Sequence, residues 1–223
     1  MPTKCPVMKA FNTKGKVVTV YCGQWTCLRC QKVLARQWAW RVRIHVDKAG
    51  KPAYFWTLTL RGNVRTAAHG FKVLPRLWDT LRKAVQRSVG KWEYVAFVEG
   101  HPKRGNIPHF HIISMAKAPR RIKDLAMYAG FGYQAKEKRV DGPGAAGYVA
   151  KYASKQHADT PRGFRRVRAS RSWSKLPEGE YDGFIVKAYT ETVSSYLMRV
   201  HEVTGIEMEI LLQRWSDAHN WED

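Results

Sequence analysis

Two strand-like segments joined by a short connection constrain the fold of this chain more than any other feature. The segments are WEYVAFVEG (92–100) and PHFHIIS (108–114), and HPKRGNI (101–107) connects them. Both are rich in β-branched and aromatic residues, which favours strands. A connection this short suits neighbouring antiparallel strands. We therefore expect a sheet in which these two segments lie close together.

The other segments predict helices and further strands around this pair. Strands are expected at PAYFWTLTL (52–60), at 132–140 and at 181–190, and helices at 71–89, 120–130 and 145–157. DGPG (141–144) predicts a turn, and 191–221 predicts two acidic helices broken near Gly205. The pattern is typical of an α+β fold with a central antiparallel sheet flanked by helices. The expected domains are a cysteine-rich module at 1–36, a main domain at 37–177, and a final strand with acidic helices packed on that domain at 178–223.

The charge is large and unevenly distributed. The chain has 39 Lys and Arg against 18 Asp and Glu, a net charge of +21, and residues 1–177 hold 36 of those bases and only 8 of the acids. Such a charge attracts polyanions, and nucleic acid above all. Charge alone does not separate a nuclease from a passive binder. The N-terminus lacks the apolar core of a secretory signal, and no long apolar run is present, so we expect a cytoplasmic protein that does not contact a membrane.

A candidate metal site lies on the second of the paired strands. Alternate residues of a strand share a face, so His109 and His111 point the same way and Phe110 points to the other face. Glu99 ends the preceding strand and can supply a carboxylate beside the two imidazoles. This ligand set favours Mn²⁺ or Mg²⁺. Two histidines in this spacing are common without a metal, so the pair needs support from other motifs.

The segment AAGYVAKYASKQH (145–157) holds two candidate nucleophiles. Tyr148 and Tyr152 are one helical turn apart and share a face, and Lys151 and Lys155 share the adjacent one. A phenol is a poor nucleophile until nearby positive charge stabilises its anion. Attack on DNA would give a 5′-phosphotyrosine and a free 3′-OH. Taken alone, the segment fits an amphipathic core helix better. The histidine pair and the basic charge favour the catalytic interpretation.

Three stretches together resemble the HUH endonuclease family, in particular the two-tyrosine initiators of small single-stranded DNA phages. FWTLTL (55–60) resembles the first-motif strand, EGHPKRGNIPHFHII (99–113) the metal-binding motif, and GYVAKYASK (147–155) the nucleophile helix. The resemblance implies that Glu99, His109 and His111 bind the metal. It also implies nicking at an origin of rolling-circle replication, priming from the 3′-OH, and later rejoining, with both tyrosines acting in turn and a separate host helicase unwinding the DNA.

Other classes of protein remain as alternatives. Relaxases usually carry a third histidine and an N-terminal tyrosine, whereas these tyrosines follow the histidines. A transposase of the same superfamily typically uses one tyrosine, and this chain has two. A non-catalytic, zinc-containing nucleic-acid binder is an alternative of a different class.

All four cysteines lie in the first 30 residues, at Cys5, Cys22, Cys27 and Cys30. The last two form a C-x2-C pair, which is typical of half a zinc site. Disulfides are not expected in a reducing cytoplasm. The stretch CGQWTCLRCQKVLARQWAWR (22–41) also resembles the N-terminal segment of microvirus-type phage initiators. Structural zinc and free buried thiols both remain open, because the spacing between the second and third cysteines is uncommon.

The segment PRGFRRVRASRSWSK (161–175) follows the tyrosines and is strongly basic, with no acid. We expect it to contact single-stranded DNA, with its arginines on phosphates and an aromatic ring stacked on a base. A solvated basic loop is the alternative. The candidate DNA-binding residues are Arg162, Arg165, Arg166, Arg168, Arg171 and Trp173, with Phe164 as a second candidate for stacking.

Overall fold

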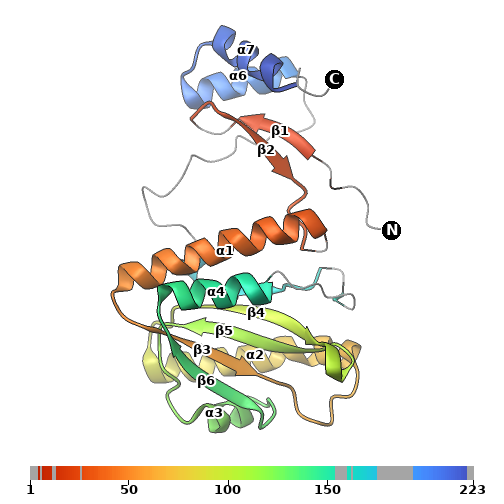
Figure 1. Cartoon of the computed structure of the whole chain (residues 1–223), viewed down its shortest axis with the longest axis vertical. Helices are drawn as coiled ribbons and strands as arrows, with labels where there is room; N and C mark the ends of the chain where they lie inside the picture. Colours follow the sequence, from red (N-terminus) through yellow and green to blue (C-terminus); the bar gives the residue numbers. More distant parts are fainter. Residues whose placement is uncertain are drawn as a thin grey trace. The chain divides into compact units, whose positions relative to one another are not determined.

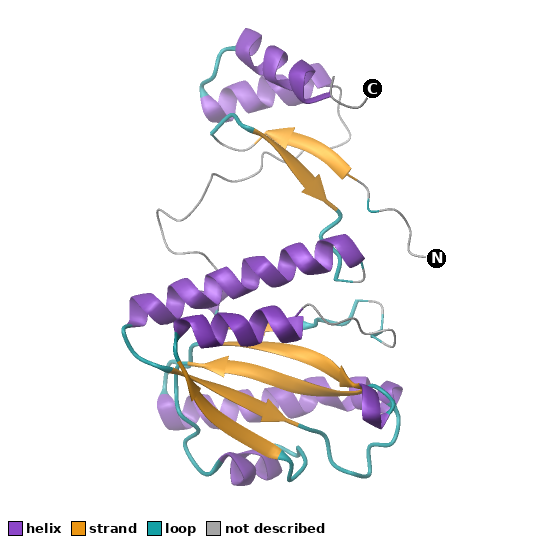
Figure 2. Cartoon of the chain, in the orientation of Figure 1, coloured by secondary structure: helices purple, strands orange, loops and turns teal. Residues whose placement is uncertain are grey.

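The chain forms two compact units in the computed structural model, Gln24–Pro177 and a second unit made of Met1–Gly23 with Glu178–Asp223. The structure describes residues 5, 7–11, 14–25, 27–153, 160–161, 163–174 and 193–219 (Figures 1 and 2). The predicted division at residues 36 and 177 stays a prediction. Each unit is described by itself below.

A five-stranded antiparallel sheet forms the centre of the larger unit. Its strands are β3 (Ala53–Leu58), β4 (Tyr94–His101), β5 (Ile107–Ser114), β6 (Ala135–Val140) and β7 (Val167–Ala169). They lie in the order β6-β3-β5-β4-β7. The predicted α+β fold class is confirmed, and the two segments joined by the short connection are neighbours as expected. Within this sheet, only β7 lies in a region where no strand was expected, because its three residues are too few to show a period.

Helices cover both faces of this sheet. One face is covered by α1 (Leu28–Ala49) and α4 (Gly142–Ala153), and the other by α2 (Ala67–Val89) and α3 (Ile122–Tyr128), as Figure 1 shows. Two short helical turns complete the unit, η1 (Pro102–Arg104) after β4 and α5 (Arg171–Ser174) after β7. The predicted helices at 71–89, 120–130 and 145–157 therefore correspond to α2, α3 and α4.

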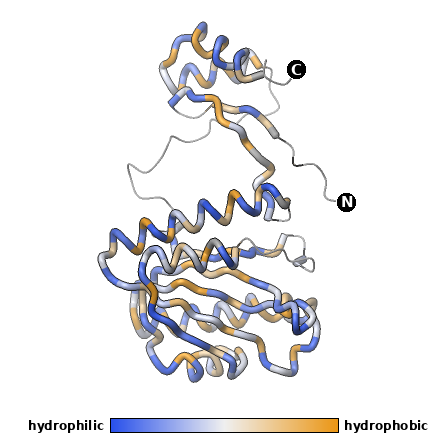
Figure 3. The backbone as a smooth tube through the Cα atoms, viewed as in Figure 1, coloured by the Kyte–Doolittle hydropathy of each residue, from blue (hydrophilic) through white to orange (hydrophobic). Residues whose placement is uncertain are grey.

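The two helical layers bury alternate residues of the strands. On β3, Trp56 and Leu58 face α2, whereas Phe55 packs on the side of α1 and α4. In Figure 3 the central strands are mostly apolar and the edge strand β6 is mostly hydrophilic. The central strands therefore hold residues of both cores, and polar residues on them stand out as candidates for function.

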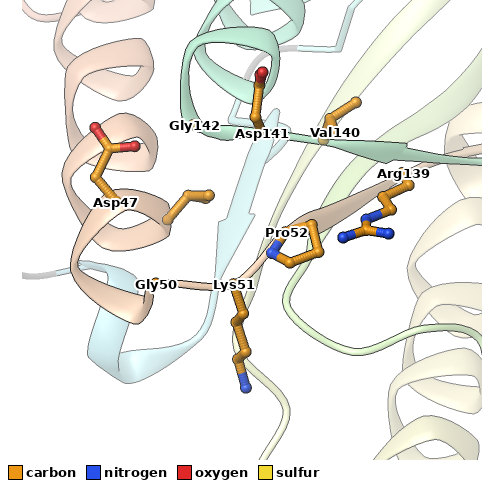
Figure 4. A pocket seen from close by; sticks show the side chains of 9 residues that line it. Asp47, Gly50, Lys51, Pro52, Arg139, Val140, Asp141 and Gly142 are labelled. Carbon is orange, nitrogen blue, oxygen red and sulfur yellow. The ribbon is translucent and has the colours of Figure 1, made fainter.

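The predicted turn at 141–144 is wrong, because it is the first turn of α4. The Asp141 carboxylate accepts a hydrogen bond from the Gly144 N–H at 2.6 Å, which caps the helix. A pocket of about 420 Å³ lies here, where α1 ends and α4 begins (Figure 4). A Cβ atom at Gly142 would overlap the carboxylate of Asp47 from α1. Glycine at this position therefore allows α1 and α4 to approach each other closely.

The smaller unit joins the two ends of the chain. A hairpin of β1 (Val7–Phe11) and β2 (Val17–Tyr21) packs with α6 (Val193–Thr204) and α7 (Met208–His219). Phe11 is fully buried in this unit, and its N–H donates to the hydroxyl of Tyr196 at 2.7 Å. The break between the two acidic helices falls at Gly205, whose φ is +67°, as predicted. The strand expected at 181–190 lies outside the described residues.

Candidate active site

The two histidines and the glutamate from the sequence analysis come together on the central strands. Glu99 on β4 lies directly opposite His109 on β5. The Oε2 atom of Glu99 lies 2.7 Å from His111 Nε2 and 3.7 Å from His109 Nε2, and the two Nε2 atoms are 3.0 Å apart. All three side chains are buried. We refer to Glu99, His109 and His111 as the ligand group.

The turn between the strands sets this register. Gly105 and Asn106 both have positive φ values, 59° and 57°, and the Asn106 N–H donates to the His101 carbonyl at 3.0 Å. Positive φ is easy for glycine and more accessible to asparagine than to most other residues. The chain reverses there within a few residues, which places the end of β4 beside the start of β5.

The ligand group fits a divalent metal ion. One donor atom from each of its three side chains lies within 4.8 Å of the others. The Thr57 hydroxyl lies 3.2 Å from His111 Nδ1 and can accept a hydrogen bond from it. When Nδ1 is the donor in this bond, His111 Nε2 carries a lone pair that can coordinate a metal. The arrangement can therefore hold a cation, and the side chains alone do not decide which one.

The two tyrosines of α4 lie against this group. The Tyr152 ring stacks on the His111 imidazole with a centroid distance of 3.8 Å, and the Tyr148 ring is parallel to Tyr152 at 6.0 Å. Phe55 of β3 contacts three of these rings, His111, Tyr148 and Tyr152, at 5.3, 4.1 and 5.5 Å. Both tyrosines are partly exposed. Residues from three elements therefore form one aromatic stack that ends on a ligand histidine.

Two lysines accompany the tyrosines. The exposed Lys151 has its Nζ atom 5.4 Å from the centre of the Tyr152 ring. The sequence analysis missed Lys138 on β6, whose Nζ donates to the Tyr148 hydroxyl at 3.3 Å. The charged run AKEKRV (135–140) indicates an exposed edge strand, but pairing with Phe55 is a long-range feature that no local pattern reveals. Lys155 lies outside the described residues.

The predicted DNA-binding segment divides into exposed and buried side chains. Arg165 and Arg171 are exposed, and Phe164 is partly exposed and packs against Phe71 at 4.9 Å. The two arginines are therefore accessible to phosphates. Arg162 lies outside the described residues.

Two other predicted DNA-binding residues, Arg166 and Arg168, are in different surroundings. Arg166 is 6% exposed, its guanidinium lies 5.2 Å from the Trp25 ring centre, and its charge interacts favourably with Glu99. Arg168 extends over Phe110, on the sheet face that packs against α2, and burial lowers its pKa.

The prediction that Trp173 stacks a nucleotide base needs correction. The side chain is 2% exposed and is stacked on His45 of α1 at 5.3 Å. No ring face is open to a base in this position, so the residue packs in the core. Large aromatic residues in a basic segment fit both roles, and the sequence alone could not separate them.

The four cysteines are divided between the two units. In the smaller unit, Cys5 Sγ is 3.7 Å from Cys22 Sγ, and both residues are partly buried. In the larger unit, Cys27 precedes α1 and is partly buried, and Cys30 lies in the first turn of α1 and is buried. Cysteine thiolates are good ligands for zinc.

Comparison with known proteins agrees with this geometry at the level of a family. Residues 53–157 match the family described as Replication-associated protein ORF2/G2P. The matched region, just under half of the chain, contains the ligand group and both tyrosines. The match supports a protein of the replication-initiator type and suggests a role in DNA replication. No curated protein and no solved structure matches the chain significantly. Among the described helices, none has the length and apolar character needed to cross a membrane.

Proposed function

We propose that this chain initiates rolling-circle DNA replication by nicking and rejoining single-stranded DNA through a tyrosine. The contact between Tyr152 and His111 carries the proposal, because it places a candidate nucleophile on a candidate metal ligand. A core tyrosine would satisfy the packing of α4 equally well. The core interpretation does not account for the buried His109 and Glu99, which form one group with the histidine beneath the ring.

The ligand group would hold a divalent ion, Mn²⁺ or Mg²⁺, whose positive charge polarises the phosphodiester. Tyr148 or Tyr152 attacks the phosphorus atom, so a phenolic O–P bond forms and the P–O3′ bond breaks. The phenolic proton is released, and the departing 3′ oxygen gains a proton. Rejoining reverses these steps when a 3′-OH attacks the phosphotyrosine.

The lysines stabilise the charge that develops in this reaction. Lys138 donates to the Tyr148 hydroxyl, and Lys151 lies over the Tyr152 ring, so each lysine places positive charge beside a candidate nucleophile. Since the tyrosines are parallel and one turn apart, only one phenol can be in line with a given phosphate. We propose that each tyrosine serves one of the two strand transfers. Lys155 is proposed to help in the same way.

The substrate is proposed to be single-stranded DNA at a replication origin, and Arg165 and Arg171 are its proposed phosphate contacts beyond the site. A host helicase would unwind the DNA, and the reaction would take place in the cytoplasm of the host cell.

The four cysteines are proposed to bind one structural Zn²⁺ ion, which elemental analysis of the purified chain would detect at about one per chain.

A nicking assay on labelled single-stranded DNA tests the proposal. We expect cleavage with Mn²⁺, none in excess EDTA, and a covalent adduct that peptide mapping assigns to Tyr148 or Tyr152. His109→Ala and His111→Ala should abolish cleavage and leave most of the DNA affinity, which comes from phosphate contacts. The double variant Tyr148→Phe, Tyr152→Phe should bind DNA and form no adduct. Full cleavage in EDTA, or by the double variant, would contradict the proposal. DNA binding without any cleavage would favour the non-catalytic binder.

A further inference from the structure

Arg166 is a buried cation whose charge interacts with Glu99 of the ligand group. It is 6% exposed, and its carbonyl accepts a hydrogen bond at 2.9 Å from the N–H of Val98, the residue before Glu99. Burial lowers its pKa to about 10, and Glu99 partly offsets this effect. The guanidinium therefore remains charged at neutral pH. A buried charge is costly unless another charge or dipole stabilises it.

Glu99 is the only carboxylate of the ligand group, and two cations would share it. A divalent ion bound by the Glu99 carboxylate and two neutral imidazoles gives the site a net charge of +1. The Arg166 guanidinium raises this net charge to +2. Like charges in a buried site repel strongly. A negatively charged group bound beside both cations would remove this repulsion, and a DNA phosphodiester carries one negative charge.

We propose that Arg166 is a catalytic residue that binds the phosphodiester being cleaved, together with the metal ion. The inference rests on the proposed function and adds a residue to the same site. A guanidinium suits this task because its planar N–H groups can contact two phosphate oxygens at once. Arg166 is held in place by its backbone bond to β4 and by the Trp25 ring, so it needs little reorganisation when DNA binds.

A purely structural role for Arg166 is the competing explanation. In that case the arginine only balances the charge of Glu99 before the metal binds. Both explanations predict tighter metal binding when the arginine is removed, because a competing cation is lost. Only the proposed contact predicts slow cleavage once metal and DNA are both saturating.

The test uses the full chain with Arg166→Met, Arg166→Lys and a matched control, Arg41→Met. Arg41 is partly buried, and its guanidinium also lies over a tryptophan, 5.1 Å from the Trp38 ring centre. The measurements are Mn²⁺ affinity without DNA and the single-turnover cleavage rate at saturating Mn²⁺ and DNA. Loss of one preorganised charge contact slows such a step by about 100-fold or more.

We expect Arg166→Met to bind Mn²⁺ several-fold more tightly and to cleave about 100-fold more slowly, and Arg41→Met to resemble the wild type. Arg166→Lys keeps the charge and loses the planar fork, so it should cleave about 10-fold more slowly with near-normal Mn²⁺ affinity. A wild-type cleavage rate in Arg166→Met would overturn the inference. If thermal melting shows that Arg166→Met is unfolded, the cleavage rate of Arg166→Lys tests the inference instead. A wild-type cleavage rate in Arg166→Lys would then overturn the inference. If the wild-type chain itself fails to cleave, the proposed function fails and this inference fails with it.

Discussion

At the scale of single residues, the site depends on contacts that orient two side chains. Thr57 orients the His111 imidazole, and Lys138 contacts the Tyr148 hydroxyl. Neither residue coordinates the proposed metal ion or attacks the phosphate. Their effects should therefore appear as partial losses, each in a different measurement.

Replacing Thr57 should weaken metal binding. Thr57→Val removes the acceptor that fixes the proton on His111 Nδ1 and keeps the shape of the side chain. Loss of such a contact typically lowers metal affinity by about 10-fold to 100-fold. We expect the Mn²⁺ concentration for half-maximal cleavage to rise by that factor, with the rate recovering at high Mn²⁺. Thr59→Val is the control, because the Thr59 hydroxyl donates to the Gln134 carbonyl away from the ligand group. Equal Mn²⁺ dependence in the two variants would contradict the role given to Thr57.

Replacing Lys138 should impair one tyrosine selectively. A hydrogen bond to a developing charge contributes about 1.5 kcal/mol or more, which is about tenfold in rate. In a Tyr152→Phe background, where only Tyr148 can react, Lys138→Met should slow adduct formation about tenfold. In a Tyr148→Phe background the same change should have little effect. Equal losses in both backgrounds would mean that Lys138 acts on the DNA rather than on Tyr148.

The sequence predicted part of this residue-level picture. The ligand group could be found because strand alternation and a short connection are local features. The surroundings of Arg166 and the burial of Trp173 could not be predicted from the sequence, because both depend on packing between segments far apart in the chain. Phe55 illustrates the same limit. Its segment predicted a strand, but nothing in it showed that the ring would contact His111 and both tyrosines.

At the scale of elements, α4 positions both tyrosines, and its packing explains how. Ala145, Val149 and Ala153 are buried at intervals of four residues, and the neighbouring stripe presents Tyr148 and Tyr152 to Phe55. The helix is short, so its ends matter for its stability. Its start was predicted as a turn because Asp, Pro and Gly are typical of turns. The same residues also begin helices, where Asp caps and Pro fits the first turn.

Removing the cap of α4 should lower the stability of the larger unit. Asp141→Ala loses the bond to the Gly144 N–H, which costs about 1 kcal/mol in the free energy of unfolding. Asp141→Asn is the matched control, because asparagine caps helices as well as aspartate. Urea unfolding, followed by the fluorescence of the buried tryptophans of this unit, measures the difference. Identical unfolding curves for the alanine and asparagine variants would show that the side chain of Asp141 does not stabilise α4.

At the scale of the whole molecule, charge and fold together bear on where the proposed DNA substrate would bind. The excess of positive charge lies in residues 1–177. The sheet of the larger unit has two faces, and different helices cover each of them. The ligand group and the tyrosines lie on the face of α1 and α4. Basic residues such as Lys83 and Arg87 are exposed on α2, across the sheet. Net charge alone therefore does not choose a face, whereas the proposed reaction at the tyrosines requires the DNA on the face of α1 and α4.

The salt dependence of DNA binding tests whether DNA contacts the segment after α4 or the exposed surface of α2. For single-stranded DNA, each phosphate contact contributes about 0.7 to the slope of log affinity against log salt concentration. Arg165→Gln with Arg171→Gln should therefore reduce the magnitude of the slope by about 1.4, because both side chains are exposed in the segment after α4. The control is Lys83→Gln with Arg87→Gln, which removes the same charge from α2 and should leave the slope nearly unchanged. Both pairs are measured in the Tyr148→Phe, Tyr152→Phe background, so that cleavage does not disturb the equilibrium. If the α2 pair lowers the slope and the other pair does not, the DNA lies on the opposite face from the tyrosines. That result would separate DNA binding from the candidate active site and contradict the proposed function.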